Sequence, residues 1–209
     1  MQPTPTLRER KKARTREALI DAAQRLFAKQ GYAATTVDDI AAEAEVSRRT
    51  FFRYFTNKES VVFPDNAERL AHFQALLGAA APGEAPFECV RRACLTIASD
   101  LMAGADAYAE QQRLVTTSHT LMAHELETDR EWEAAIAVAL LCGNTAKHEP
   151  ADPRHEHRAR ILAGAVMGAI RATLKHWREG ECKANLIELG SAALDLLEGG
   201  VARTPFARR

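Results

Sequence analysis

Two adjacent arginines, Arg48 and Arg49, carry the most specific chemistry in this sequence. A guanidinium presents a planar fork of N–H donors that fits two neighbouring acceptors, such as phosphate oxygens or the O6 and N7 atoms of guanine. Ser47, directly before the pair, can cap a helix, which would place both arginines in its first turn. We interpret them as a nucleic-acid contact, and a pair of solvated surface arginines is the alternative.

Short-range patterns predict the helices that would position this pair. Apolar residues recur at three- and four-residue steps in a first helix, expected to begin at Thr15 and to stop at Gly31. Thr36 can cap a second helix of barely two turns, and a third, capped by Ser47, is expected from Arg48 to about Phe55. Two short helices joined by a tight turn and braced by a longer one form a helix-turn-helix, whose second helix enters the major groove of DNA.

The charges are balanced overall but unevenly distributed. The chain has 28 basic and 28 acidic residues, and the first 58 residues hold 12 of the basic and 7 of the acidic ones, a net charge of +5. The remaining 16 basic and 21 acidic residues give the rest of the chain a net charge of −5. This asymmetry indicates a polyanion-binding head on an acidic body. Long stretches rich in Ala, Leu, Glu and Arg predict an all-α fold.

A resemblance to a known family lies in the stretch TREALIDAAQRLFAKQGYAATTVDDIAAEAEVSRRTFFRYFTNKESVV. It is similar to the DNA-binding domain of the tetracycline-repressor (TetR) family, with the pattern T-x-x-x-I-A-x-x-A-G-V-S-x-x-T-x-Y-x-Y-F-x-x-K-x-x-L. The resemblance covers under a quarter of the chain, but caps, turn and aromatic positions all fall in register. It implies a three-helix DNA-binding domain with its N-terminal arm over residues 1–58 and a helical ligand-binding and dimerisation domain over residues 59–209. The body, in Leu126 to Ala139 and Arg171 to Trp177, resembles an actinobacterial subfamily more weakly.

Two residues depart from the family pattern. Glu45 stands where the family usually has glycine, so a left-handed backbone there would cost about 1 kcal/mol. Phe52 stands where a tyrosine usually contacts phosphate, and it lacks that hydroxyl.

The predicted DNA contacts lie on the second and third helices and at the start of the fourth. Arg48 or Arg49 would bond a guanine, Thr50 would contact a thymine methyl or a phosphate, and Lys58 would meet a phosphate at a helix N-terminus. The basic run from Arg8 to Arg16 is either a minor-groove arm or a solvated tail. The full set of candidates is Thr36, Ser47, Arg48, Arg49, Thr50, Phe52, Arg53, Tyr54 and Lys58.

The body is expected to consist of long helices near residues 88–104, 107–118, 122–146, 152–179 and 183–198, with Pro64 ending or kinking the fourth helix early. The resemblance implies that the middle helices enclose a small-molecule pocket, although core packing is the alternative for every residue in it. The pocket candidates are Phe73, Phe87, Met102, Tyr108, His119, Met122 and Trp132. For a two-fold dimer interface the candidates are Gly164, Gly168, Leu174, Trp177, Leu186 and Leu194, and intrachain core is again the alternative.

Other functional classes have weaker support. The chain has no signal-peptide core and no apolar run long enough to cross a bilayer, so a cytoplasmic protein is expected. Its four cysteines form no C-x-x-C pair, His148, His155 and His157 form no metal-ligand motif, and no cofactor motif is present. We therefore predict a homodimeric repressor with operator DNA, a second copy and a small apolar or amphipathic effector as partners. The alternatives are a helical scaffold or an enzyme.

Overall fold

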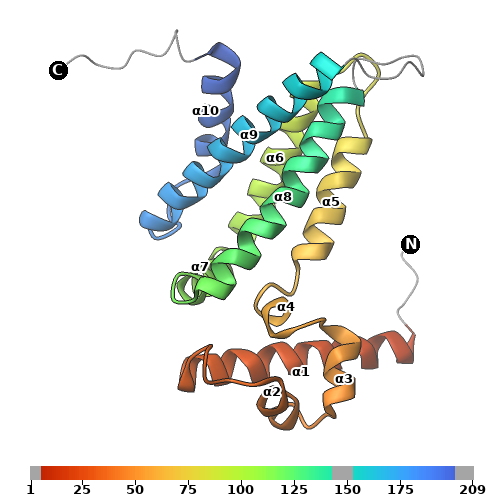
Figure 1. The fold of residues 1–209 in the computed structure, drawn as a ribbon, viewed down its shortest axis with the longest axis vertical. Helices are drawn as coiled ribbons and strands as arrows, with labels where there is room; N and C mark the ends of the chain where they lie inside the picture. Colours follow the sequence, from red (N-terminus) through yellow and green to blue (C-terminus); the bar gives the residue numbers. More distant parts are fainter. Residues whose placement is uncertain (1–5, 143–152, 201–209) are drawn as a thin grey trace, which may run out of the picture. The chain divides into compact units, whose positions relative to one another are not determined.

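The computed structural model describes residues 6–142 and 153–200, and within them the chain forms ten helices and no strand (Figure 1). The predicted all-α fold is therefore confirmed for this part of the chain. The helices are α1 (Leu7–Gln30), α2 (Val37–Glu43), α3 (Arg48–Tyr54), α4 (Lys58–Val62), α5 (Asn66–Gly78), α6 (Pro86–Ala103), α7 (Ala105–Val115), α8 (His119–Cys142), α9 (Pro153–Glu179) and α10 (Leu186–Gly199).

The described residues separate into two compact units. Unit 1 holds the residues up to Asp65 together with Gln111–His124, and unit 2 holds Asn66–Glu110 and the residues from Glu125 onward. The expected boundary at residue 58 differs from this division. Helix α4 and the segment 111–124 belong with unit 1 because their apolar side chains are buried in its core, namely Val61, Val62, Phe63, Val115 and Leu121.

Helix α1 begins at Leu7, so the start expected at Thr15 was wrong. Thr6 and Glu9 form a complete capping box, in which the Thr6 hydroxyl accepts from the Glu9 amide and the Glu9 carboxylate accepts from the Thr6 amide at 2.7 Å. The basic residues that follow are good helix formers, so the helix extends through them. At its other end Gly31 adopts φ +82°, and its amide donates to the Phe27 carbonyl at 2.9 Å, as predicted.

Pro64 lies between α4 and α5, which confirms the predicted early end of the fourth helix. The capping box at the start of α4 is formed by Asn57 and Ser60.

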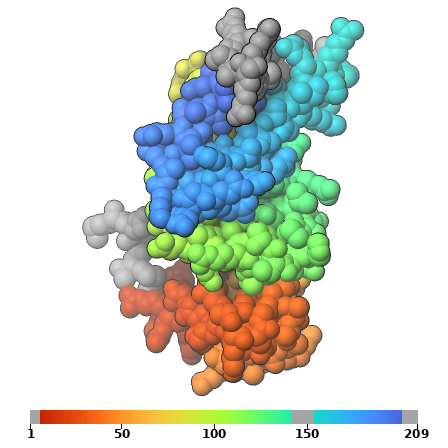
Figure 2. All heavy atoms as spheres, turned by 90° about the vertical axis from the view of Figure 1, so that its left-hand side faces the viewer, coloured from red at the N-terminus to blue at the C-terminus, as the bar shows by residue number. Residues whose placement is uncertain are grey.

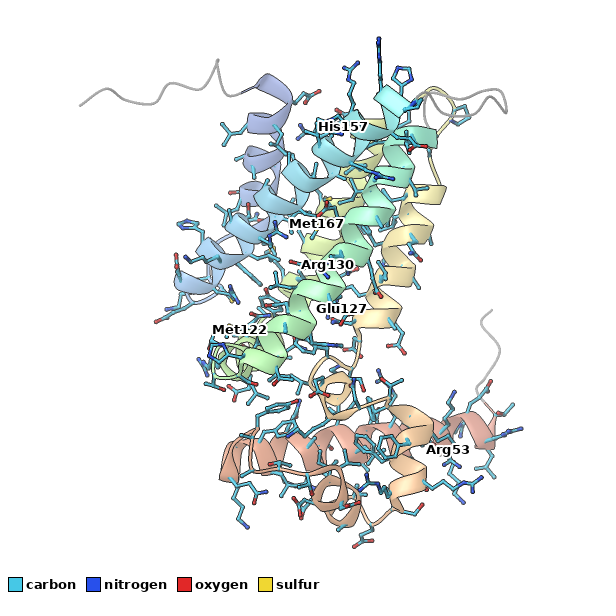
Figure 3. The ribbon with its side chains drawn as sticks, in the orientation of Figure 1. Arg53, Met122, Glu127, Arg130, His157 and Met167 are labelled. Atoms are coloured by element: carbon cyan, nitrogen blue, oxygen red, sulfur yellow. The ribbon has the colours of Figure 1, made fainter. Side chains whose placement is uncertain are left out.

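Unit 2 is built around α6, which packs against α5 and α10, while α10 also packs against α9. Figure 1 shows α5, α6 and α8 aligned along one direction and α9 inclined to them. Phe73 of α5 and Trp132 of α8 stack with ring centroids 4.7 Å apart. Met167 of α9, labelled in Figure 3, is buried in the same core. Trp177 is fully buried there, and its Nε1–H donates to the Ala184 carbonyl at 2.8 Å.

Candidate nucleic-acid interface

Local caps fix the ends of α2 and α3. The Thr36 hydroxyl accepts from the Asp39 amide, and the Asp39 carboxylate accepts from the Thr36 amide at 2.8 Å. Ser47 caps α3 by accepting from the Thr50 amide at 3.1 Å. Both caps agree with the prediction from sequence, so the start of each helix follows from residues within four positions of it.

The turn between α2 and α3 keeps a left-handed residue at Glu45, with φ +53°. The chain then closes back on α2, since the Val46 amide donates to the Ala41 carbonyl at 2.9 Å. The expected strain at Glu45 is thus present, because a side chain with a Cβ occupies a conformation that glycine adopts more easily.

One face of α3 packs into unit 1 and the other is open. Phe51 is fully buried and Phe55 is 5% exposed, and both belong to the core cluster with α1 residues. Arg49 and Arg53, four positions apart, are exposed on the side away from these two rings, and Arg48 is exposed at the start of the helix. Figure 3 shows the labelled Arg53 projecting outward from α3. The predicted arginines therefore form an accessible basic face on the second helix of a helix-turn-helix.

Arg48 is held on this face by two neighbours. Its Nη1 donates to the Asp38 carboxylate of α2 at 2.6 Å, and its guanidinium lies 5.5 Å from the centroid of the Phe52 ring, one turn along α3. Phe52 is 45% exposed and also meets Phe51 edge-on. Sequence reasoning did not identify Asp38, because it lies ten residues before its partner and only the crossing of α2 over α3 brings them together.

The remaining small polar candidates are used within the motif or half-buried. The Thr50 hydroxyl is within hydrogen-bond distance of the Ser47 hydroxyl at 2.9 Å, and the Thr36 hydroxyl donates to Asp39 at 2.7 Å. The Tyr54 hydroxyl accepts from Arg53 Nη2 at 3.4 Å. Each of these hydroxyls therefore already has a hydrogen-bond partner within the protein.

Lys58 begins α4, as expected, and its side chain has partners within unit 1. Its ammonium donates to the backbone carbonyls of Tyr32 and Thr35, each at 2.8 Å, and lies 4.0 Å from the centroid of the Tyr32 ring. The side chain therefore ties the start of α4 to the loop between α1 and α2. These carbonyls accept strongly from a cation, and the phosphate contact of Lys58 stays a prediction.

The basic stretch at the start of the chain is helical from Leu7, with Arg8, Arg10, Lys11, Lys12 and Arg14 all exposed on α1. An α-helix with its side chains is about 10–12 Å wide, whereas the minor groove is about 6 Å wide. These residues therefore form neither the minor-groove arm nor the loose tail that the sequence left open.

The predicted pocket residues fall into two groups. Five of the seven pack on the core of unit 2: Phe73, Phe87, Met102, Tyr108 and Trp132. Met122 instead packs on the core of unit 1, and His119 is exposed at the start of α8. Apolar spacing alone could not separate them, because α8 begins in unit 1 and continues in unit 2.

The predicted dimer residues also fall into two groups, core residues and a residue with open space around it. Trp177 is fully buried, and Leu186 and Leu194 are each 2% exposed within the protomer, so these three side chains form core and not free surface. Leu174 packs partly buried against the same core. A Cβ at Gly164 would lie 3.4 Å from Glu133, whereas at Gly168 it would meet nothing within 4 Å, so only Gly168 faces open space. Of the six, Gly168 therefore has the geometry that an interface needs.

Exposed apolar side chains on α9 and α10 were missed from the sequence. Ile161 is 57% exposed, Leu162 47% and Leu196 53%. Figure 2 shows α9 and α10, in the blue range of the colour bar, together covering one face of unit 2. Tertiary packing decides which side of each helix is buried, so the exposure of these residues could not be predicted from their spacing.

Other kinds of site have no support in the described residues. Within residues 6–142 and 153–200 no group of three or more His, Cys, Asp or Glu side chains is arranged to hold a metal ion, and His148 lies outside that part. None of the described helices combines the length and the apolar character needed to cross a membrane.

Two family models match most of this chain. Residues 19–63 match the family described as bacterial regulatory proteins, tetR family, and residues 84–202 match the MftR C-terminal domain. The transcriptional regulator TcmR of Streptomyces glaucescens is 32% identical over 179 residues, which cover 83% of this chain and 77% of TcmR.

Two further proteins are similar to this chain over most of its length. The regulator MftR of Mycobacterium tuberculosis is 26% identical, with 93% of this chain and 94% of MftR covered. The crystal structure of Thermus thermophilus FadR in complex with lauroyl-CoA is 25% identical and superposes with a TM-score of 0.58 over 93% of this chain and 99% of FadR. The capped α2–turn–α3 unit, its exposed arginines and these matches together show that the chain belongs to the TetR family of transcriptional regulators and carries an MftR-type C-terminal domain.

Proposed function

We propose that this regulator is a homodimeric repressor that binds a near-palindromic operator and leaves it when a small apolar or amphipathic effector binds. The observation that carries the proposal is the exposed face of α3, where Arg48 and Arg49 stand in the first turn behind the Ser47 cap. Residues in the first turn of a recognition helix are the ones that reach base edges. The match to TcmR and MftR supports regulation of transcription.

The contacts divide by chemistry. Arg48 and Arg49 are assigned to base edges, because a bidentate guanidinium distinguishes guanine from the other bases. Thr50 is assigned to a thymine methyl or a phosphate, and Phe52 to apolar contact with the DNA edge. Arg53, Tyr54, Ser47 and Thr36 are assigned to phosphates, which position a protein without reading sequence.

The dimer interface is assigned to the outer sides of α9 and α10. Ile161, Ala165, Gly168 and Ala172 follow one another at steps of four, three and four residues, which places them on one side of α9, and none of the four is buried. Leu196 of α10 is also exposed, at 53%. A two-fold axis through such a surface repeats the same patch on both subunits and sets the recognition helices about 34–36 Å apart or somewhat wider.

The effector site is assigned to unit 2, around Phe73, Met102, Tyr108 and Trp132. Aromatic and thioether side chains suit an apolar ligand, and a few polar groups fix its orientation. Thermus thermophilus FadR, a TetR-family repressor, binds lauroyl-CoA, an amphipathic molecule. The effector must bind the DNA-free state more tightly, because only a difference in affinity shifts the equilibrium.

The proposal is tested by selecting duplexes from a random pool with the wild-type protein and measuring their affinity against salt. We expect enrichment of a two-fold symmetric sequence, and a loss of about 1–3 kcal/mol for Arg49→Ala or Arg48→Ala with relaxed preference at one operator position. Arg53→Ala should weaken all duplexes alike and reduce the salt slope by about 1. A protein that enriches no sequence would support the scaffold alternative.

A further inference from the structure

The carboxylate of Asp38 is the nearest charged partner of a proposed base-reading side chain. It accepts from Arg48 Nη1 at 2.6 Å and comes from α2, whereas Arg48 lies at the start of α3. The pair is open to solvent, with 62% of the Asp38 side chain and 61% of the Arg48 side chain exposed. An exposed ion pair adds little to folding, so its main consequence is where it holds the guanidinium.

Arg48 is held from two sides. The carboxylate fixes one nitrogen, and the Phe52 ring, 5.5 Å from the guanidinium carbon, supports the plane of the group. An arginine has five N–H donors, so one bond to Asp38 leaves donors for another acceptor. The side chain is thus restrained in direction before any nucleic acid arrives, and less rotamer entropy is lost on binding.

The charge of Asp38 also discriminates between acceptors. A phosphate that approached Arg48 would bring a negative charge close to the Asp38 carboxylate, and the two would repel. The guanine edge offers acceptors with no net charge, so it meets no such repulsion. Phosphates occur in every duplex, whereas guanine occurs only at certain positions, and a repulsive element against the common competitor is a general route to specificity.

We propose that Asp38 is a specificity-determining residue of this regulator, which holds Arg48 toward the base edge and keeps it from acting as a general phosphate contact. The proposal rests on the proposed function, since it assumes that α3 enters the major groove. It assigns Asp38 to orienting Arg48, without any contact between the carboxylate and DNA.

The chain offers a matched control on the same helix. Glu43 of α2 accepts from Arg25 Nε of α1 at 3.1 Å, and both side chains are exposed. Glu43→Gln removes one negative charge from α2, as Asp38→Asn does, but leaves Arg48 and its partner intact. Any general effect of charge on DNA affinity should appear in both variants.

The experiment uses the full chain and two duplexes of equal length: the sequence selected by the wild-type protein, and a scrambled sequence of the same composition. For Asp38→Asn we expect about two- to fivefold tighter binding to the scrambled duplex, the range of exposed ion pairs. Its salt slope should be steeper by about 1, since Arg48 gains a phosphate. The ratio of selected to scrambled affinity should therefore fall, and Glu43→Gln should keep the wild-type ratio.

A double-mutant cycle separates orientation of Arg48 from simple charge removal. In an Arg48→Ala background, Asp38→Asn should leave the ratio unchanged, because no guanidinium remains to be released. The proposal is overturned if Asp38→Asn keeps the wild-type ratio, if Glu43→Gln lowers it equally, or if the effect persists without Arg48. Asp38→Ser, compatible with the first turn of a helix, repeats the test should the asparagine variant fold poorly. If the wild-type protein selects no duplex, the proposed function itself fails, and the assignment of Asp38 fails with it.

Discussion

The hydroxyl of Tyr32 donates to the carboxylate of Glu59 at 2.7 Å, across 27 residues of chain. Burial and this carboxylate raise the pKa of Tyr32, so the hydroxyl stays protonated and remains a donor. Glu59 lies in the first turn of α4, and Tyr32 in the loop after α1. Together with Lys58, which reaches the same loop, the pair fastens α4 to the rest of unit 1.

Lys58→Met should therefore lower stability without changing DNA charge contacts. Two bonds from the ammonium to backbone carbonyls are lost, for which we expect about 1–3 kcal/mol in the free energy of urea unfolding. Lys175→Met is the control, because Lys175 is exposed and has only a 3.9 Å pair with Glu179 on its own helix. A salt slope lower by about 1 for Lys58→Met would show that Lys58 also meets a phosphate, and unchanged stability would show that the two carbonyl bonds contribute nothing.

Glu45→Gly should stabilise unit 1. Glycine adopts φ +53° without the steric cost of a Cβ but loses more backbone entropy on folding, so we expect a net gain of about 0.5–1 kcal/mol. Glu45→Ala keeps the Cβ and should give no such gain. Equal melting temperatures for the glycine and alanine variants would show that the turn is not strained.

The caps of α2 and α3 could be predicted from sequence because each depends on residues within one turn. The start of α1 was missed although its signal was equally local, since Thr6 with Glu9 forms a capping box and the basic residues after it favour a helix. Thr15 is also a good capping residue, but here its hydroxyl donates to the Lys11 carbonyl inside the helix. When a sequence offers two capping residues, the helix propensity of the segment between them decides where the helix begins. Here that segment is helical, so the helix begins at the earlier cap.

The other differences depend on long-range packing. Trp177 and Leu186 have the same apolar character as an interface residue, and nothing in their spacing distinguishes core within one subunit from contact between two. Lys58 at a helix start suits a phosphate, and local patterns do not show that its ammonium also donates to the carbonyls of Tyr32 and Thr35 in a distant loop. The partnership of Asp38 with Arg48 requires the crossing of two helices, which local patterns do not contain.

Asp129 gives unit 2 a pH dependence. Burial is the largest effect on this carboxyl and raises its pKa above the ordinary 3.8, while Arg171, with Nη1 3.5 Å away, acts in the opposite direction. A raised pKa in the folded state means that stability is fully present below pH 3.8 and is lost as the pH rises through the folded value. Asp129→Asn should therefore gain stability relative to the wild type between pH 3.5 and pH 7. A difference in unfolding free energy that stays constant over that range would contradict this.

Gly168→Leu should prevent dimerisation while leaving the subunit folded. The glycine lies on the outer side of α9, and a Cβ there meets nothing within 4 Å in the protomer, so the folded subunit accommodates the larger side chain. In a close helix contact with a second copy the same side chain would clash, and we expect sedimentation to show monomers at micromolar concentration together with loss of operator binding. Gly104→Leu, at another glycine with open space around its Cβ, is the matched control and should stay dimeric. A Gly168→Leu variant that is dimeric and binds operator normally would place the interface elsewhere.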